Sequence, residues 1–150
     1  MDIYLDSLLH LPYVTVESCI RQDAEVLLKL RLLNPSSACP HCKQSSTEIH
    51  QTRFIVVRDL SISGQATYLR VPRPQFYCRA CQRYFTESLS FIREGRQYTE
   101  RYEEYIYQQV QSSSIQQVSR VESLSWERVE GIFKHQYAQK KTVNGQESNG

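Results

Sequence analysis

Two matched pairs of cysteines constrain the fold of this 150-residue chain more than any other feature of its sequence. Four of the five cysteines stand in two C-x2-C motifs, Cys39/Cys42 and Cys78/Cys81. A C-x2-C turn places two thiolates on one side of a tight knuckle, and two knuckles supply the tetrahedral sulfur shell that zinc prefers. Because four thiolates leave no open position for water, the sequence predicts one structural Zn2+ rather than a catalytic ion.

Histidines near the first motif offer an alternative ligand set, since His41 lies inside the motif and His50 follows it. Four thiolates already close the shell, so the cysteines remain the preferred ligands. A redox role is disfavoured, because neither pair stands at the start of a helix that follows a strand. The fifth cysteine, Cys19, has no partner in the sequence and is interpreted as a half-buried small apolar residue.

The expected compartment supports metal binding over disulfide formation. No apolar run approaches the roughly 20 residues that a membrane span needs. The N-terminus is acidic and lacks the basic start of a signal peptide. We therefore expect a cytoplasmic, nucleoid-associated protein with no membrane contact, in a reducing environment where paired cysteines bind metals.

The first part of the chain has the patterns of a helix and a hairpin. Residues 1–12 predict a short amphipathic helix that Pro12 ends. Apolar and polar residues alternate over 14–20, and 26–33 reads as a mostly buried strand. The polar turn between these runs indicates a β hairpin.

The segment between the cysteine pairs is also rich in β-formers. Two runs, 53–58 and 66–71, are joined through a Gly-containing segment and favour a second hairpin. Pro72 and Pro74 follow and limit any central strand there, because proline cannot donate a hydrogen bond to a neighbouring strand.

After residue 96 the composition changes, and helix-forming residues dominate. We expect helices over 98–111, 115–122 and 126–136, with Ser114 and Ser125 as the N-caps of the last two. The predicted fold class is α+β: an N-terminal β hairpin and zinc ribbon followed by a small helical domain. The predicted domains are 1–36 (N-terminal helix and hairpin), 37–95 (zinc ribbon), 96–137 (helix-turn-helix region) and 138–150 (disordered tail).

The last two predicted helices have the layout of a helix-turn-helix, with a tight turn over 123–125. Val118, Leu124, Val129 and Ile132 fall where this motif needs apolar packing. Three residues depart from it: Ser119 replaces a small Ala, Ser123 a turn Gly, and Glu122 an apolar residue. A plain helical hairpin is the alternative. In a helix-turn-helix, the second helix would present to DNA Glu127, Arg128, Gly131, Lys134 and His135.

Positive charge is concentrated between residues 53 and 101, where nine arginines face four acidic residues and no lysine. Arginine suits bidentate contacts to phosphate. A solvated basic face is the alternative interpretation. The residues predicted to contact the DNA backbone are Arg53, Arg58, Arg70 and Arg73.

The ordered set of motifs resembles the N-terminal region of ISL3-family transposases, over about residues 5–137. The resemblance implies a zinc ribbon and a helix-turn-helix that bind double-stranded DNA at transposon ends, such as terminal inverted repeats. A ribonuclease-H-type catalytic domain follows in such transposases, whereas residues 138–150 could not supply one. The resemblance rests on Cys39-Pro40-His41-Cys42, His50-Gln51-Thr52-Arg53-Phe54, Arg58-Asp59-Leu60, Gly64, Tyr68-Leu69-Arg70-Val71, Arg73-Pro74-Gln75-Phe76-Tyr77-Cys78, Cys81, Phe85-Thr86-Glu87 and Leu124-Ser125-Trp126-Glu127-Arg128-Val129.

The sequence therefore predicts a zinc-containing DNA-binding protein without strand-transfer activity. The alternative is a zinc-ribbon adaptor or regulator that docks a protein partner, and homodimerisation is a further option. An enzyme is disfavoured, because no nucleophile–base pair, phosphate-binding loop or open metal site is evident.

Overall fold

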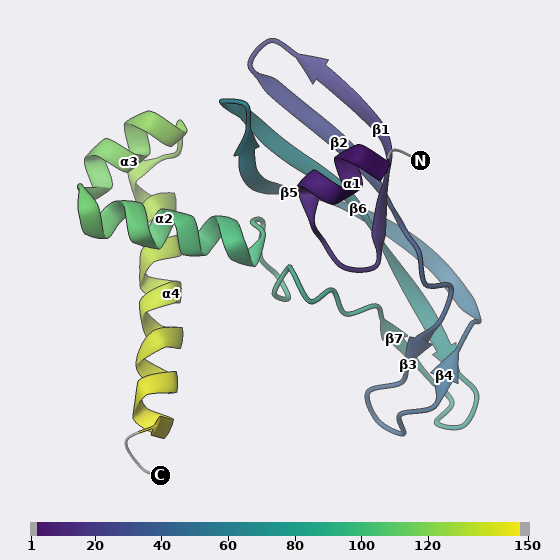
Figure 1. Cartoon of the computed structure of the whole chain (residues 1–150). Helices are drawn as coiled ribbons and strands as arrows, with labels where there is room; N and C mark the ends of the chain where they lie inside the picture. The colour runs from purple at the N-terminus through teal and green to yellow at the C-terminus, as the bar shows by residue number, and fades with distance from the viewer. Residues whose placement is uncertain (1–2, 148–150) are drawn as a thin grey trace. The chain divides into compact units, whose positions relative to one another are not determined.

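The structure, a computed structural model, describes residues 3–147 and confirms the α+β class (Figure 1). The chain folds into two compact units that divide between Thr99 and Glu100. The first unit contains all the strands and one short helix, and the second contains three helices.

A five-stranded sheet forms the first unit, with strand order β1-β2-β6-β5 and with β7 paired to β6. The predicted N-terminal hairpin, β1 and β2, is part of this sheet because β2 pairs in parallel with β6. A second sheet contains only β3 and β4. The strands are β1 (Val14–Gln22), β2 (Glu25–Leu32), β3 (Ser37–Ala38), β4 (Ser45–Ser46), β5 (Ile49–Ile62), β6 (Gln65–Cys78) and β7 (Arg83–Thr86).

The β5–β6 hairpin is longer than the two predicted runs. Its two-residue turn is Ser63-Gly64, and both residues have positive φ, 51° and 74°. Positive φ at both central positions is the geometry of a type I′ turn, which matches the twist of paired strands and favours glycine. The turn fixes the register that carries β6 from the centre of the sheet to Cys78.

The two prolines lie inside β6 rather than ending it, which corrects the expected limit on a strand there. Pairing of β6 with β2 ends at Arg70, and pairing with β7 begins only at Gln75. Between these positions β6 pairs with β5 alone. On its other edge, no neighbouring strand among the described residues accepts hydrogen bonds from the backbone N–H groups of β6. Pro72 and Pro74 occupy this gap, where a missing N–H costs no ladder bond.

One face of the sheet holds the core. Helix α1 (Ile3–Leu9) and the segment after β7 cover it, and a single apolar cluster joins them to the strands. Asp6 fixes α1 to β1: its carboxylate accepts hydrogen bonds from the Val16 backbone N–H and the Thr15 hydroxyl, both at 2.7 Å. These bonds lower the pKa of the Asp6 carboxyl, chiefly through the Val16 N–H.

Helices α2 (Glu100–Ser112), α3 (Ile115–Glu122) and α4 (Trp126–Glu147) form the second unit. The structure differs from the predicted disordered tail, because α4 continues through 138–147; residues 148–150 lie outside the described residues. Packing on α2 explains the extension. Lys140 Nζ lies 2.9 Å from the Glu104 carboxylate and 5.0 Å from the centre of the Tyr107 ring.

Replacing Asp6 with Asn should lower the melting temperature of the first unit at neutral pH. A carboxyl whose pKa is lower in the folded than in the unfolded protein stabilises the fold at pH values above its unfolded pKa of about 4. That stabilisation disappears as the pH falls through the pKa of the folded state. The difference between wild type and Asp6→Asn should therefore shrink below about pH 4. Thermal melts followed by circular dichroism across pH would measure it, with exposed Glu17→Gln as the charge-matched control. A difference that persisted unchanged at low pH would contradict the assignment.

Candidate zinc centre and nucleic-acid interface

The structure brings the four predicted cysteines together from two knuckles. Cys39 follows β3, and Cys78 is the last residue of β6, so the two knuckles approach from different strands. Their four sulfur atoms all lie within 4.8 Å of one another, and the described residues offer no other group of three or more potential ligands. The knuckles therefore form one compact tetrathiol cluster.

The sulfur spacing fits a tetrahedral metal ion. The Sγ atoms of Cys39 and Cys81 are 3.9 Å apart, and those of Cys42 and Cys78 are 3.6 Å apart. With Zn–S bonds of about 2.3 Å, tetrahedral geometry places sulfurs about 3.8 Å apart. Cys39 and Cys78 are buried, which suits a closed structural shell rather than an open catalytic one.

Backbone geometry shapes both knuckles in the same way. The residue after each motif, Lys43 or Gln82, has positive φ, 66° or 56°, which turns the chain sharply back. The N–H of Lys43 donates to the carbonyl of Cys39 at 2.8 Å, closing the first turn. The first knuckle is joined to the second through the Ser46 hydroxyl, which donates to the Tyr77 carbonyl at 2.6 Å.

The surroundings of the cluster lower the pKa of one thiol, Cys39, and raise the pKa of another, Cys81. Hydrogen bonding from the backbone N–H of Cys42, more than that of His41, lowers the pKa of Cys39 to about 7. Hydrogen bonding to Cys42, followed by burial and the other two thiols, raises the pKa of Cys81 to about 12. A dication supplies the charge that lets all four sulfurs ionise together.

The neighbouring histidines take no part in the cluster. His50 packs its ring against Tyr84, with ring centres 4.8 Å apart, and His41 is exposed at the tip of the first knuckle. Cys19, predicted half-buried, is exposed on the edge strand β1. A small apolar cluster around Cys39 and Cys78, with stacked Phe76 and Phe85, supports the zinc end of the unit.

Helices α3 and α4 have the caps predicted for a helix-turn-helix. The Ser114 hydroxyl accepts from the Gln117 N–H at 3.1 Å, and the Ser125 hydroxyl accepts from the Arg128 N–H at 3.2 Å. Both bonds satisfy donors that a helix N-terminus leaves open. Val118, Val129 and Ile132 are buried, so three of the four predicted packing positions face the core of the unit, while Leu124 is half-buried.

The three unusual residues of the motif are each accommodated. The Ser119 hydroxyl donates to the Leu124 carbonyl in the turn, which satisfies both groups. Buried Glu122 accepts a hydrogen bond from the Tyr102 hydroxyl of α2 at 3.4 Å. Burial of the Tyr105 side chain, and secondly the nearby charge of Glu122, raise the pKa of Tyr105. Ser123 adopts the left-handed conformation, φ 54° and ψ 42°, and its N–H donates to the Ser119 carbonyl as a helix C-cap.

The structure separates the predicted contacts on α4 into two groups. Glu127, Arg128, Gly131 and Lys134 are exposed, and Lys134 Nζ lies 2.9 Å from Glu130 on the same helix. His135 instead faces α2, where its Nδ1 is 3.2 Å from the fully buried carboxylate of Glu103. The expectation of His135 on the outward face is therefore corrected, since it pairs with a buried acid.

Other residues on α4 join the outward face. Trp126, the first residue of the helix, is 51% exposed. Lys141 is exposed on the same helix but was assigned to the predicted tail. Lys141 follows Lys134 by seven residues, about two helical turns, and this spacing is the signal that would have found it.

The predicted DNA-contacting arginines of the sheet also fall into two groups, accessible and internally held. Arg53 is exposed on β5, and the Arg70 guanidinium lies 3.9 Å from the centre of the partly exposed Phe54 ring. Arg58 is only 7% exposed, and Arg73 donates through Nε and Nη2 to the Glu87 carbonyl at 3.2 and 2.9 Å. Arg58 and Arg73 are thus held inside the unit by burial or by a hydrogen bond, which the concentration of arginines in the sequence could not indicate.

Comparison with known proteins gives the same two modules in the same order. Residues 35–81 match the zinc-finger of transposase IS204/IS1001/IS1096/IS1165, and residues 87–137 match the helix-turn-helix domain of transposase family ISL3. This chain carries the zinc-ribbon and helix-turn-helix region of ISL3-family transposases. With the sulfur geometry, the zinc-finger match establishes a structural zinc site.

A curated relative supports the assignment. The chain is 31% identical over 96 residues, 64% of its length, to "Transposase for insertion sequence element IS1001" of Bordetella parapertussis. It spans about a quarter of that relative, 24% of its length. No solved structure matches significantly. None of the described helices combines the length and apolar character that a membrane span requires.

Removing zinc should unfold the knuckles while leaving the main sheet paired. The cluster at the zinc end is small and depends on metal ligation, whereas β2, β5 and β6 share the larger core. Hydrogen exchange with and without chelator should show protection lost over 37–48 and 76–86 but largely kept over 26–30.

Cys78→Ser and Cys39→Ser should destabilise the zinc end equally, and elemental analysis of the wild type should give one zinc per chain. Fewer than half a zinc in chelator-free protein would contradict this.

Replacing Ser123 with Gly should stabilise the helical unit by about 1 kcal/mol, because a non-glycine residue pays about that cost in the left-handed conformation. Urea denaturation followed by circular dichroism would measure the change. Gln116→Gly, on the exposed surface of α3, is the matched control and should destabilise by about 1 kcal/mol. Equal destabilisation by both variants would mean that the turn does not adopt this conformation in solution.

Proposed function

We propose that this chain binds double-stranded DNA and recognises transposon ends such as terminal inverted repeats. The observation that carries the proposal is a capped helix-turn-helix whose second helix leaves Arg128, Gly131 and Lys134 exposed. The N-terminal part of such a helix contacts base edges in the major groove, and its later residues contact phosphate. The match to a transposase helix-turn-helix domain supports the same use.

The proposal assigns different tasks to the exposed residues of α4. Arg128, in the first turn, is suited to a bidentate contact with guanine, and Glu127 can accept from the amino group of cytosine. Gly131 lets the helix approach the base edges closely, since it lacks a side chain. Lys134 and Lys141 are suited to phosphate, and half-exposed Trp126 could pack on the sugar–phosphate backbone.

The sheet contributes fewer contacts than its arginine content suggested. Arg53 and Arg70 remain proposed phosphate contacts because both retain exposed surface. Arg58, Arg73 and His135 are left out of the proposed interface, because burial or an internal hydrogen bond holds each side chain. The proposed DNA contacts are therefore Arg53 and Arg70 in the first unit and, separately, Trp126, Glu127, Arg128, Gly131, Lys134 and Lys141 in the second.

A protein-docking role is the second candidate. The face of the sheet opposite the core exposes Phe54 and Val56, and apolar surface of this kind is common in protein interfaces. Salt dependence distinguishes the two functions, because phosphate neutralisation makes affinity fall steeply with salt while an apolar interface does not. Three further expectations remain predictions: that the chain forms homodimers, that these residues carry out no strand transfer, and that the protein is cytoplasmic and nucleoid-associated.

Arg128→Ala should weaken binding to transposon-end DNA by roughly 1–3 kcal/mol and relax sequence preference. Lys134→Ala should weaken all DNA alike and lower the slope of log affinity against log salt by about one unit. Fluorescence anisotropy with end and scrambled duplexes at several salt concentrations would measure both. Arg21→Ala, which removes the same charge from an exposed position on β1, is the control and should bind like wild type.

Folded Arg128→Ala and Lys134→Ala proteins that bind end DNA like wild type would overturn the proposal. The helical unit would then be better explained as a docking surface for protein. Circular dichroism and zinc content establish that each variant is folded.

A further inference from the structure

The face of β6 that enters the main core becomes exposed at the zinc end of the sheet. Leu69 and Val71 are buried in the core, but beyond them burial moves to the intervening positions, which support the zinc cluster. Successive side chains of a strand point to opposite faces. The face of Leu69 and Val71 therefore continues, partly exposed, through Arg73, Gln75 and Tyr77.

Strand pairing adds polar side chains to this face from β5 and β7. Gln75 pairs with Gln51 on one side and with Thr86 on the other. The side-chain Nε2 of Gln51 donates to Gln75 Oε1 at 3.2 Å. Arg53 and Arg73 form the next pair on the same face, and Arg53 is its exposed member. The face thus presents amide groups beside an accessible guanidinium.

Three aromatic rings, those of Tyr77, Tyr84 and His50, continue this face and form an aromatic cluster. Tyr77 and Tyr84 are cross-strand partners on β6 and β7, with ring centres 5.0 Å apart. His50 lies where the register of β5 and β6 shifts, which can re-aim a side chain, and its ring centre is 4.8 Å from that of Tyr84. Tyr84 is 53% exposed, so a ligand can reach the central ring of the cluster.

Basic residues dominate the segments that carry the aromatic cluster. Residues 37–53 and 73–86 contain five basic residues and one acidic residue, Glu48, which pairs with Arg79 at 2.8 Å. A dication held by four thiolates keeps a net negative charge, but this is smaller than the excess of basic residues. Exposed rings on a positively charged surface are suited to nucleic acid, whose bases can stack and whose phosphates are negative.

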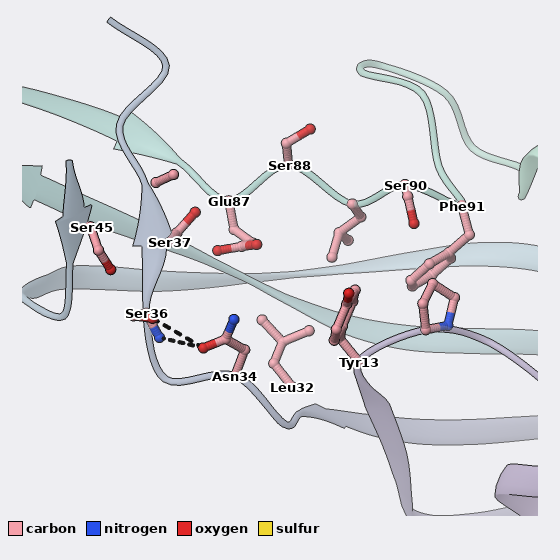
Figure 2. Close-up of a pocket in the computed structure, with 13 residues that line it drawn as sticks. Tyr13, Leu32, Asn34, Ser36, Ser37, Ser45, Glu87, Ser88, Ser90 and Phe91 are labelled. Atoms are coloured by element: carbon pink, nitrogen blue, oxygen red, sulfur yellow. Dashed lines mark hydrogen bonds between the residues drawn. The ribbon is translucent and has the colours of Figure 1, made fainter. Parts of the chain in front are cut away.

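The pocket in Figure 2 has a different character, although it borders the first knuckle. Its volume is about 440 Å³, and Ser37 and Ser45 of the two-stranded sheet line one side of it. The described residues that line it include Glu87 and several serines but no Lys, Arg or His. Because phosphate binding depends on cations, the aromatic face is better suited to a nucleic acid than this pocket is.

Exposed rings favour unpaired bases over a duplex. In double-stranded DNA each base is covered by its neighbours, so a side-chain ring can stack only on a base that has left the stack. Tyr84 can stack on such a base, and Gln51 and Gln75 can offer amide donors and acceptors to its edge. Arg53, on the same face, is suited to a neighbouring phosphate.

We propose that this face of β5, β6 and β7 binds single-stranded DNA, with Tyr84 as the main stacking residue. The inference goes beyond the duplex binding proposed for the helical unit. It depends on the three rings of the aromatic cluster, which are not among the proposed duplex contacts, and on a form of DNA whose bases are accessible.

Fluorescence anisotropy of zinc-loaded protein with an end-labelled oligothymidine of ten nucleotides measures this binding. An abasic strand of the same length is the matched ligand, because it keeps the phosphates and lacks the bases. It should bind roughly tenfold more weakly or worse, since stacking supplies much of the affinity. Absence of saturable binding to the oligothymidine, or equal binding of the abasic strand, would overturn the proposal and leave the rings to a protein partner.

Substitutions at Tyr84 locate the site. Tyr84→Leu removes the ring and should weaken binding to the oligothymidine roughly tenfold, whereas Tyr84→Phe keeps the ring and should bind within about twofold of wild type. Tyr4→Leu, at an exposed tyrosine of α1, is the matched control and should bind like wild type. Unchanged affinity in Tyr84→Leu would contradict the assignment.

Transposon-end duplex distinguishes this site from the proposed function. Tyr84→Leu should keep its affinity for the duplex, and an equal loss on both ligands would refute a single-strand site. Wild type that bound the single strand but not the duplex would instead refute the duplex proposal alone. If Tyr84→Leu lost zinc or failed to fold, photo-crosslinking of wild type to a 5-iodouracil strand would decide: crosslinks are expected at the aromatic cluster, and crosslinks confined to the helical unit would overturn the proposal.

Discussion

The pairing of β6 with three other strands is the constraint on which the first unit depends. Near its start β6 lies between β2 and β5, where Leu69 and Val71 enter the main core; near its end it lies between β5 and β7 and delivers Cys78 to the zinc cluster. Because residues on a strand alternate between faces, a one-residue slip would reverse every side chain and remove the core and the zinc ligand together. The positive-φ turn at Ser63-Gly64 and the metal thus fix the same register from opposite ends of the strand.

Much of this arrangement could be predicted from short patterns in the sequence. Two C-x2-C pairs identified the zinc ligands, alternation identified the hairpins, and Ser114 and Ser125 marked the helix starts, because each signal involves residues close in the chain. The passage of β6 through Pro72 and Pro74 could not be predicted, since it depends on where pairing with β2 stops and pairing with β7 starts. The length of α4 depended similarly on contacts between Lys140 and α2, which a polar composition does not reveal.

The helical unit places charged groups where apolar residues are usual. Glu103 is fully buried and contacts His135 and Gln136, while Glu122 is buried against Tyr102. A buried carboxylate is tolerated only when neighbouring groups supply hydrogen bonds, so both acids require α2 to pack against α3 and α4 in this arrangement. The residue that weakened the helix-turn-helix pattern in the sequence, Glu122, is therefore one that links the motif to its supporting helix.

Internal hydrogen bonds also decide which basic side chains are available to contact DNA. Arg73 and Arg53 face each other across β5 and β6, yet Arg73 donates to the Glu87 carbonyl in the gap beside the prolines, whereas Arg53 is exposed. The same gap holds the Glu87 backbone, whose N–H donates to the Pro74 carbonyl. A nucleic-acid contact needs a cation whose donors are accessible, so the count of arginines overstates the basic surface of this sheet. The gap in pairing that accommodates two prolines thereby also holds the Arg73 side chain on the Glu87 carbonyl, which makes its donors less available to DNA.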